Sequence, residues 1–129
     1  MSRAEFHVHD DVLELLAPEV LDISDVEEMF RRLAELRQRH PRPFLLVRNG
    51  GPTLSTVTRR ALTGGIKAAT APLECATYGG GMVQRVVVDM TRRAVELLTP
   101  GKLILASCKT RQEAVAWIDA RRRLPPPGR

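Results

Sequence analysis

The sequence predicts an α/β fold with a mostly parallel sheet, an antiparallel hairpin at one edge and helices packed on the sheet. Short apolar runs alternate along the chain with longer segments of helical periodicity. Glycine and proline residues separate most of these segments. Strands that alternate with helices imply parallel pairing through crossover connections. The expected order of elements is therefore β-β-α-β-α-β-α-β-α.

The first two segments predict the hairpin. Residues 4–9 alternate between polar and apolar side chains, Asp10-Asp11 is a turn signal, and residues 12–16 resume an apolar run. His7 and His9 share the polar face of the first strand. Metal sites usually need three or four ligands, and no third ligand lies nearby in the sequence. We therefore interpret both histidines as solvent-facing and expect no metal site.

The next two segments predict a helix and a buried strand. A capping box opens the helix, with Ser24 as the N-cap and Glu27 as its partner. Apolar residues then recur at helical spacing until the pattern ends near His40, before Pro41. The apolar run 44–47 is typical of a strand that is covered on both faces.

A second helix is expected to start at Ser55, after a loop that contains Gly50-Gly51. Its expected buried positions are Val57, Ala61 and Leu62. We expect Gly64-Gly65 to weaken this helix or to end its first segment, with a second short turn over residues 66–70.

The last third of the chain predicts two strands and two helices. The strands are residues 73–78 and 102–106, and three glycines follow the first of them. A long helix from Met82 to Leu98 has an expected inward stripe of Val83, Val86, Val87, Met90, Ala94 and Leu97. A second capping box, Thr110 to Glu113, opens the final helix, which Trp117 anchors in the core. We expect residues 1–124 to form one domain and residues 125–129 a proline-rich tail, which cannot continue a helix.

The composition is that of an ordinary globular chain. Its 129 residues are 43% hydrophobic and 27% charged, which suits one domain with one core. The net charge of +5 raises the question of nucleic acid, but the arginines are spread along the chain. Aromatic residues make up only 4%, so platforms for base stacking are scarce. We therefore do not expect a nucleic-acid-binding protein.

Cysteine content and hydropathy predict the compartment. Cys75 and Cys108 are the only cysteines, and such sparse use is typical of a reducing environment. We interpret both as small core residues, with a bridge between them as the alternative. The longest apolar runs are far shorter than the roughly 20 residues of a spanning helix. The N-terminus lacks the apolar core of a signal peptide. We expect no membrane span and a cytoplasmic location.

The passage from Phe44 to Ser55 is the strongest candidate site, because open α/β sheets place sites where strands lead into helices. A hydroxyl at a helix start is usually a cap that stabilises the helix by about 1 kcal/mol. The alternative is phosphorylation of Ser55 or Thr53, where a phosphate would meet free N–H groups and the helix dipole. Candidate contacts of such an anion, or of a partner, are Arg48, Asn49, Gly50, Gly51, Arg59 and Arg60.

The three glycines before the long helix are a second candidate loop. Gly80, Gly81 and the nearby Arg85 are candidate contacts for a small anion or a lipid headgroup. The loop lacks the Gly-Lys-Ser/Thr ending of a nucleotide-binding loop, so a flexible connection is the favoured interpretation. No histidine lies near either cysteine in the sequence, and no other local signature pairs a nucleophile with a base. We therefore expect no catalytic residues and no cofactor.

Three passages carry a resemblance to a known family. They are the strand-to-helix passage from Phe44 through Ser55 to Arg59-Arg60, the helix entry from Gly81 to Arg85, and the ending from Thr110 to Ile118 with its Glu-Ala-x-x-Trp pattern. In this order they resemble the small bacterial STAS-like domains, the fold of anti-sigma-factor antagonists. A more specific likeness is to their uncharacterised STAS/SEC14-like branch.

The resemblance implies a non-enzymatic interaction or signalling module with a protein partner, and a homodimer is one form of it. The signalling members carry an Asp-Ser pair at the start of the second helix, where a partner kinase phosphorylates the serine. Leu54-Ser55 stands in that place, so the hydroxyl is kept and the acid is not. The alternative function is a small-anion, nucleotide or lipid-binding protein that uses a glycine loop.

Overall fold

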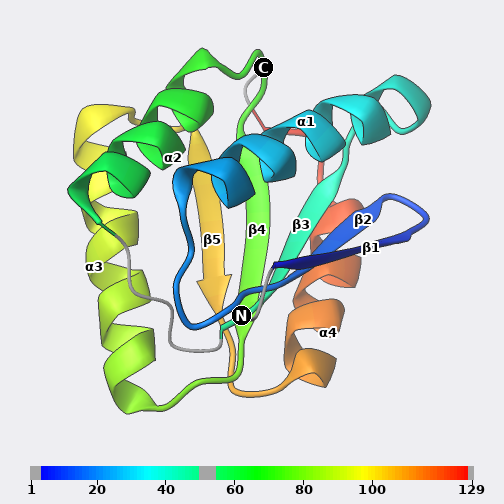
Figure 1. Cartoon of the computed structure of the whole chain (residues 1–129). Coiled ribbons are helices and arrows are strands. Elements are labelled where there is room, and N and C mark those ends of the chain that lie inside the picture. Colours follow the sequence, from blue (N-terminus) through cyan, green and yellow to red (C-terminus); the bar gives the residue numbers. More distant parts are fainter. Residues whose placement is uncertain (1–3, 50–54, 128–129) are drawn as a thin grey trace.

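The computed structural model describes residues 4–49 and 55–127, which form strands and helices in the predicted order (Figure 1). The strands are β1 (Glu5–His9), β2 (Val12–Leu16), β3 (Phe44–Arg48), β4 (Leu73–Tyr78) and β5 (Leu103–Ser107). The helices are α1 (Ile23–Arg39), α2 (Thr56–Ala68), α3 (Met82–Leu98) and α4 (Arg111–Arg122). The α/β fold class is thereby confirmed.

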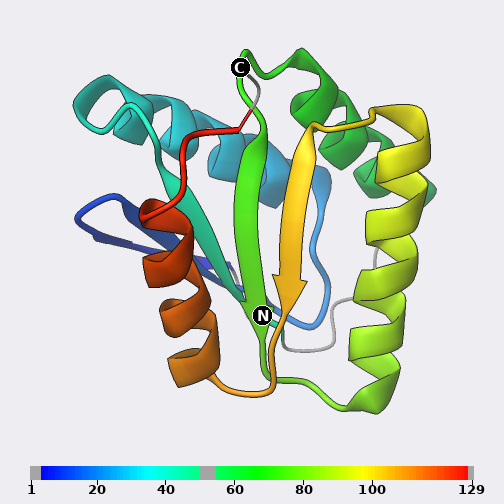
Figure 2. The same ribbon diagram turned by 180° about the vertical axis from the view of Figure 1, so that it is seen from behind.

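The described strands form one mixed sheet in the order β1-β2-β3-β4-β5. β1 pairs antiparallel with β2, and all other neighbours are parallel. The strand order increases steadily, so α1, α2 and α3 follow one another across the same face of the sheet (Figure 1). α4 returns across the opposite face, as Figure 2 shows from behind.

Each face of the sheet has its own core. Under the three helices, the register sets Leu13, Leu45, Cys75 and Leu105 in one row across β2 to β5. Helix residues that include Met29, Leu33, Leu36, Ile66 and Val95 pack on that row. On the other face Val12, Phe44, Leu46, Ala76 and Tyr78 pack against Ala114 and Ile118 of α4.

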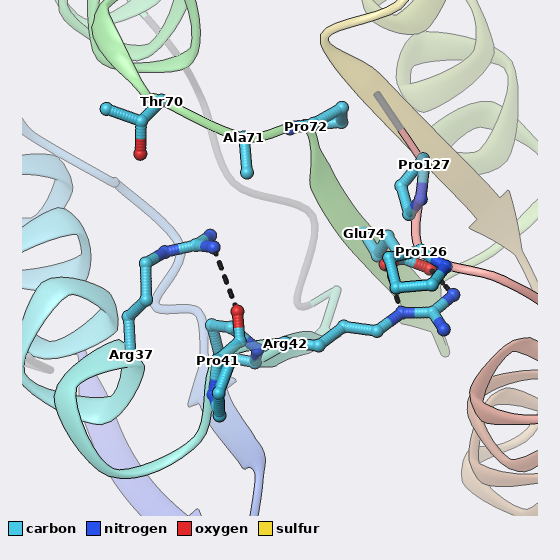
Figure 3. A pocket seen from close by; sticks show the side chains of 10 residues that line it. Arg37, Pro41, Arg42, Thr70, Ala71, Pro72, Glu74, Pro126 and Pro127 are labelled. Atoms are coloured by element: carbon cyan, nitrogen blue, oxygen red, sulfur yellow. Dashed lines mark hydrogen bonds and ion pairs between the residues drawn. The ribbon is translucent and has the colours of Figure 1, made fainter. Parts of the chain in front are cut away.

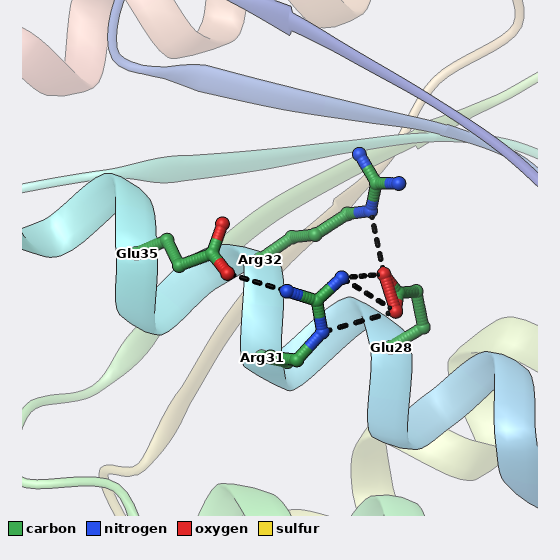
Figure 4. A network of polar contacts seen from close by, with 4 residues as sticks. All are labelled: Glu28, Arg31, Arg32 and Glu35. Atoms are coloured by element: carbon green, nitrogen blue, oxygen red, sulfur yellow. Dashed lines mark hydrogen bonds and ion pairs between the residues drawn. The ribbon is translucent and has the colours of Figure 1, made fainter.

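α1 begins earlier than the sequence predicts. Its N-cap is Asp22, whose carboxylate accepts the Asp25 N–H at 3.0 Å, while Asp25 accepts the Asp22 N–H at 3.1 Å. Ser24 instead donates its hydroxyl to Asp22 at 2.6 Å, so the predicted Ser24 cap is wrong. The helix ends at His40 as predicted. On its exposed side Arg31 lies between Glu28 and Glu35 (Figure 4), a surface network that contributes little to stability.

α2 is continuous to Ala68, which corrects the predicted break at Gly64-Gly65. A Cβ atom on Gly65 would lie 2.2 Å from Phe30 Cε2, so Gly65 lets α1 and α2 approach closely. The buried positions are Thr58 and Ile66. Val57, which was expected to be buried, is exposed, and Ala61 and Leu62 are half-buried.

The remaining boundaries lie close to their predicted places. α3 spans the predicted residues, and β5 is shifted by one residue toward the C-terminus. Thr110 caps α4 by accepting the Glu113 N–H at 3.2 Å, but the Glu113 carboxylate accepts the Lys109 N–H, so the box is not reciprocal. Trp117 is half-buried at the rim of the core, where the Arg121 guanidinium lies 5.9 Å from its ring centre.

Both cysteines are free thiols and belong to opposite faces of the sheet. Cys75 is buried under the three helices, as predicted for a core residue, whereas Cys108 is half-buried beside the α4 core. In the part of the chain that the structure describes, no helix combines the length and the hydropathy that crossing a membrane requires.

Candidate functional site

The carboxyl ends of the parallel strands lie together at one end of the sheet, beside the starts of α3 and α4 (Figure 1). Backbone hydrogen bonds join these ends. The Asn49 N–H donates to Tyr78 O at 2.7 Å, the Cys108 N–H to Thr77 O at 2.8 Å and the Gly79 N–H to Lys109 O at 3.3 Å. These bonds hold together the segments that follow β3, β4 and β5 at this end of the sheet.

The backbone conformation of the loop after β4 explains why it consists of glycines. Gly79 and Gly80 have φ values of 79° and 69°, a region that side chains disfavour. A Cβ atom on Gly80 would lie 2.9 Å from Gln84 Cβ and 3.3 Å from Asn49 O. The loop thus brings the predicted residues Asn49 and Gly80 together and adds Gln84, which the sequence did not single out.

The start of α3 already satisfies part of its own hydrogen-bonding need. Gly81 is the N-cap, and its N–H donates to the Gln84 side chain at 2.8 Å. One donor that an anion would use is therefore taken. Arg85 is half-buried on α3, and Arg48 is exposed with its stem beside Gly79.

Ser55 caps α2, as the sequence predicts. Its hydroxyl oxygen accepts the Thr58 N–H at 3.1 Å and lies 3.0 Å from the Thr58 hydroxyl. Arg59 and Arg60 are exposed on the first turns of α2. Among the described residues, no hydrogen bond or ion pair joins Ser55 to these arginines, to Arg48 or to Arg85. Gly50, Gly51 and Thr53 lie outside the described residues.

A buried polar cluster that the sequence did not reveal lies on the α4 face. The Glu14 carboxylate accepts bonds from Arg111 Nε at 3.0 Å and Nη2 at 2.9 Å, and from the Tyr78 hydroxyl at 2.6 Å. His9 Nε2 lies 3.1 Å from the same carboxylate. Glu14 and Arg111 are 97 positions apart in the chain, so no local sequence pattern predicts their contact.

The electrostatics of this cluster favour a structural role. The hydrogen bond from Arg111 holds the pKa of Glu14 at about 2, against the effect of burial, which would raise it. Burial, with the Glu14 carboxylate as a second cause, raises the pKa of Tyr78 to about 12. General acids and bases work best with a pKa near the operating pH. Neither Glu14 nor Tyr78 has such a pKa. Their contacts with each other and with Arg111 join α4 to β2 and β4.

A second buried carboxylate lies at the amino ends of the strands. Arg42 binds Glu74 through two nitrogens at 2.8 and 2.9 Å, and Arg121 adds a third contact at 3.1 Å. Arg42 and Glu74 line a hollow of about 290 Å³. Figure 3 shows them beside Pro126 and Pro127 of the tail. The Arg42 guanidinium also donates to Leu124 O, so its hydrogen bonds go to groups of the chain itself.

The two histidines of β1 each lie near a carboxylate. His7 Nε2 is 3.6 Å from Glu5, and His9 is engaged by Glu14. Within residues 4–49 and 55–127, no group of three or more histidine, cysteine, aspartate or glutamate side chains has a geometry that could hold a metal ion.

An apolar cleft under α3 is the main feature that the sequence did not predict. We call it the α3 cleft. It has a volume of about 310 Å³ and lies between α3 and the three-helix face of the sheet. Its floor includes Leu45, Val47, Leu73, Cys75, Thr77, Leu103 and Leu105. Its α3 wall consists of Gln84, Val87, Val88, Thr91 and Val95, and its remaining sides of Leu15, Leu21, Met29, Asn49, Leu62 and Ile66.

The outer side of α3 is apolar as well. We call Met82, Val86, Met90, Ala94 and Leu97 the outer stripe. Met82, Met90 and Leu97 are 74%, 63% and 84% exposed, whereas Val95 on the other side of the helix is 2% exposed. The prediction that Val86, Met90, Ala94 and Leu97 face inward is therefore wrong. Val87, which is 46% exposed, lines the α3 cleft as an inward position would, and the side chain of Val83 lies outside what the structure describes.

The physical reason is that α3 has two apolar sides. At about 100° per residue, the outer stripe covers roughly one third of the helix surface, and Val88 and Val95 lie nearly opposite its centre. Periodicity shows that such a helix is amphipathic, but a helix with apolar residues on both sides can present either to the sheet. α3 packs mainly on the edge strand β5, beyond which it lies in both views (Figures 1 and 2).

Comparisons of the chain with family models, with curated proteins and with solved structures found no match.

Proposed function

We propose that this chain is a non-enzymatic, STAS-like interaction module that docks a protein partner through the outer stripe of α3, and that the partner is a second copy of the chain. The exposure of Met82, Val86, Met90 and Leu97 on one side of one helix carries this proposal. Contiguous apolar patches on a protein surface mark interaction sites more often than chance. The stripe runs over 15 residue steps, or about 22 Å at the α-helical rise.

The stripe is self-complementary. If two antiparallel copies of α3 pack about a two-fold axis at Met90, Val86 faces Ala94 of the second copy and Met82 faces its Leu98. Such an isologous contact uses the same apolar surface twice. Leu98 is 70% exposed and extends the stripe at its end.

Charge supports the same arrangement. In that pairing Arg85 lies next to Glu96 of the second copy. Within the described part of one chain Arg85 makes no ion pair, and Glu96 accepts only the Gly101 N–H, at 3.1 Å. Two symmetric Arg85–Glu96 contacts would therefore flank the apolar centre, where opposite charges favour the correct register.

The adjacent edge of the sheet supports an interface on this side. β5 is the last described strand of the sheet, so its outer N–H and C=O groups have no neighbouring strand. The resemblance to STAS-like domains supports interaction rather than catalysis. The two free thiols support action in a reducing cytoplasm.

The oligomeric state in solution tests the proposal. We expect sedimentation velocity to give a dimer for the unmodified chain and a monomer for Met90→Glu, because the two-fold axis brings two carboxylates together. Val86→Glu should weaken the dimer. The matched control is Val8→Glu at the opposite edge of the sheet, since Val8 is 46% and Val86 52% exposed. A monomeric unmodified chain, or equal effects of Val8→Glu and Val86→Glu, would overturn the proposal.

A further inference from the structure

We propose that the α3 cleft binds a small, uncharged, mainly aliphatic molecule with one hydrogen-bonding head group. The cleft uses the side of α3 opposite to the outer stripe, so this inference does not depend on dimer formation. Ligand pockets in proteins are concave, mostly apolar and about 300–1,000 Å³ in volume. The cleft, at about 310 Å³, lies at the small end of that range.

The lining decides the charge of the ligand. Leucine, isoleucine, valine and methionine dominate it, and none of the described lining residues carries a charge. Cys75 is the one ionisable group in the floor, and burial raises its pKa to about 12, so its thiol stays protonated. A phosphate or a carboxylate inside the cleft would lose its hydration without gaining a partner charge. This excludes nucleotides and favours an uncharged chain.

The order of residues along the strands decides the orientation. At the amino end the floor consists of Leu73 and Leu103, which face each other across β4 and β5. At the carboxyl end Val47 pairs with Thr77, and Asn49 follows. Gln84 lies at the same end, since both Asn49 and Gln84 adjoin Gly80. The polarity thus rises along the cleft toward its carboxyl end.

Neutral polar side chains are suited to a neutral head group. Amide and hydroxyl groups both donate and accept hydrogen bonds. The ligand would therefore place its head near Thr77 and Gln84 and its chain over Cys75 toward Leu103. The floor from residue 73 to the level of Asn49 is about 20 Å long at the rise of a β-strand, which suits an extended chain.

Decanol and decanoate separate this proposal from anion binding, because they share a chain and differ in charge. We expect isotope-filtered NMR on the full chain to show contacts between the decanol chain and the methyl groups of Val95, Leu103 and Leu105. Titration at neutral pH should show at least tenfold weaker binding of decanoate. Absence of decanol binding, or equal binding of the two molecules, would overturn the proposal.

Two substitutions on α3 locate the site. Val88 lines the cleft, and Val86 belongs to the outer stripe. We expect Val88→Phe to fill the cleft and weaken decanol binding at least tenfold, and Val86→Phe to leave it unchanged. Decanol contacts at Met82 or Met90, or an equal loss in both variants, would assign the binding to the outer stripe and overturn the proposal. The NMR contacts are measured in the unmodified chain, so they decide the matter even if Val88→Phe does not fold.

Discussion

The two faces of the sheet are covered in different ways. α4 alone covers one face, fully buries only Ala114 and Ile118, and is joined to the sheet by ionic contacts at both of its ends. Three helices cover the other face, and their core is built from aliphatic side chains and Cys75. The α3 cleft and the outer stripe both lie on the three-helix side.

This difference follows from the kinds of contact on the two faces, because ionic hydrogen bonds depend on direction and apolar contacts do not. Arg111 binds the Glu14 carboxylate through two nitrogens, an arrangement with a defined geometry, and Arg121 binds Glu74 through Nε, so these contacts at the two ends of α4 set its position on the sheet. Apolar burial has no preferred direction. α3 can therefore lie over the sheet edge, contact β5 through part of its length and leave both a cleft and an exposed apolar side.

The largest expected effect on stability is at Glu74, on the face of the sheet that α4 covers. Glu74→Ala leaves Arg42 and Arg121, both mostly buried, without their carboxylate. Breaking a buried ion pair in this way costs about 3–5 kcal/mol, so we expect that loss in the free energy of unfolding measured with urea. The control is Glu28→Ala in the exposed network of Figure 4, which should cost less than about 1 kcal/mol. Similar losses in both variants would contradict the contrast between the faces.

The next largest effect is the pH dependence of the Glu14 contact. Because the pKa of Glu14 falls from 4.5 to about 2 on folding, the unfolded chain takes up the proton first as the pH drops. The stabilisation is complete above pH 4.5 and is lost as the pH falls toward 2, by roughly 3 kcal/mol. Glu14→Gln should be less stable at neutral pH and lose less stability over that window. Parallel stability curves for the two proteins would show that Glu14 titrates normally.

A smaller effect distinguishes the two sides of α3. Val95→Ala removes buried methyl groups and should cost about 2 kcal/mol, whereas Leu97→Ala on the outer stripe should change stability by less than about 0.5 kcal/mol. Both changes are best made in the Met90→Glu background, so that no interface between copies contributes. Chemical denaturation gives the values. A larger cost at Leu97 would mean that α3 packs on the sheet by its other side.

The smallest effect concerns the cap of α2. Ser55→Ala removes the bond to the Thr58 N–H and should cost about 1 kcal/mol, while Ser55→Asp should keep the cap within a few tenths. Thr56→Ala, at the exposed neighbouring position, is the control for thermal unfolding. The same variants test phosphorylation, which remains a prediction. If Ser55→Asp and Ser55→Ala dimerise equally, Ser55 is not a phosphorylation switch for this interface.

Much of the fold could be predicted because its signals are local. The alternation of strands and helices, the caps at Ser55 and Thr110 and the end of α1 at His40 each depend on a few neighbouring residues. The proximity of Asn49 and Gly80 could also be predicted, since they follow neighbouring parallel strands that end on the same side of the sheet. The Ser24 prediction failed because Asp22, Ser24 and Asp25 are all good caps, and only the path of the chain into α1 selects among them.

The other errors have tertiary causes. Gly64-Gly65 reads as a helix breaker by propensity, yet the ring of Phe30 from another helix requires Gly65 within an unbroken α2. The α3 cleft has no sequence signature, because its lining residues come from seven different elements and from the β2–α1 and β3–α2 connections. Its Leu, Val and Ile residues look like ordinary core positions until the gap beside α3 is seen.

The amino-acid sequence by itself determined the order of the elements and most of their ends, because these depend on hydrogen bonds and periodicity within about one turn or strand. Only the tertiary structure decided which arginine meets Glu14 or Glu74 and which side of α3 faces the sheet. Contacts between residues far apart in the chain follow from how whole elements pack, and a helix with two apolar sides satisfies its local pattern in either orientation.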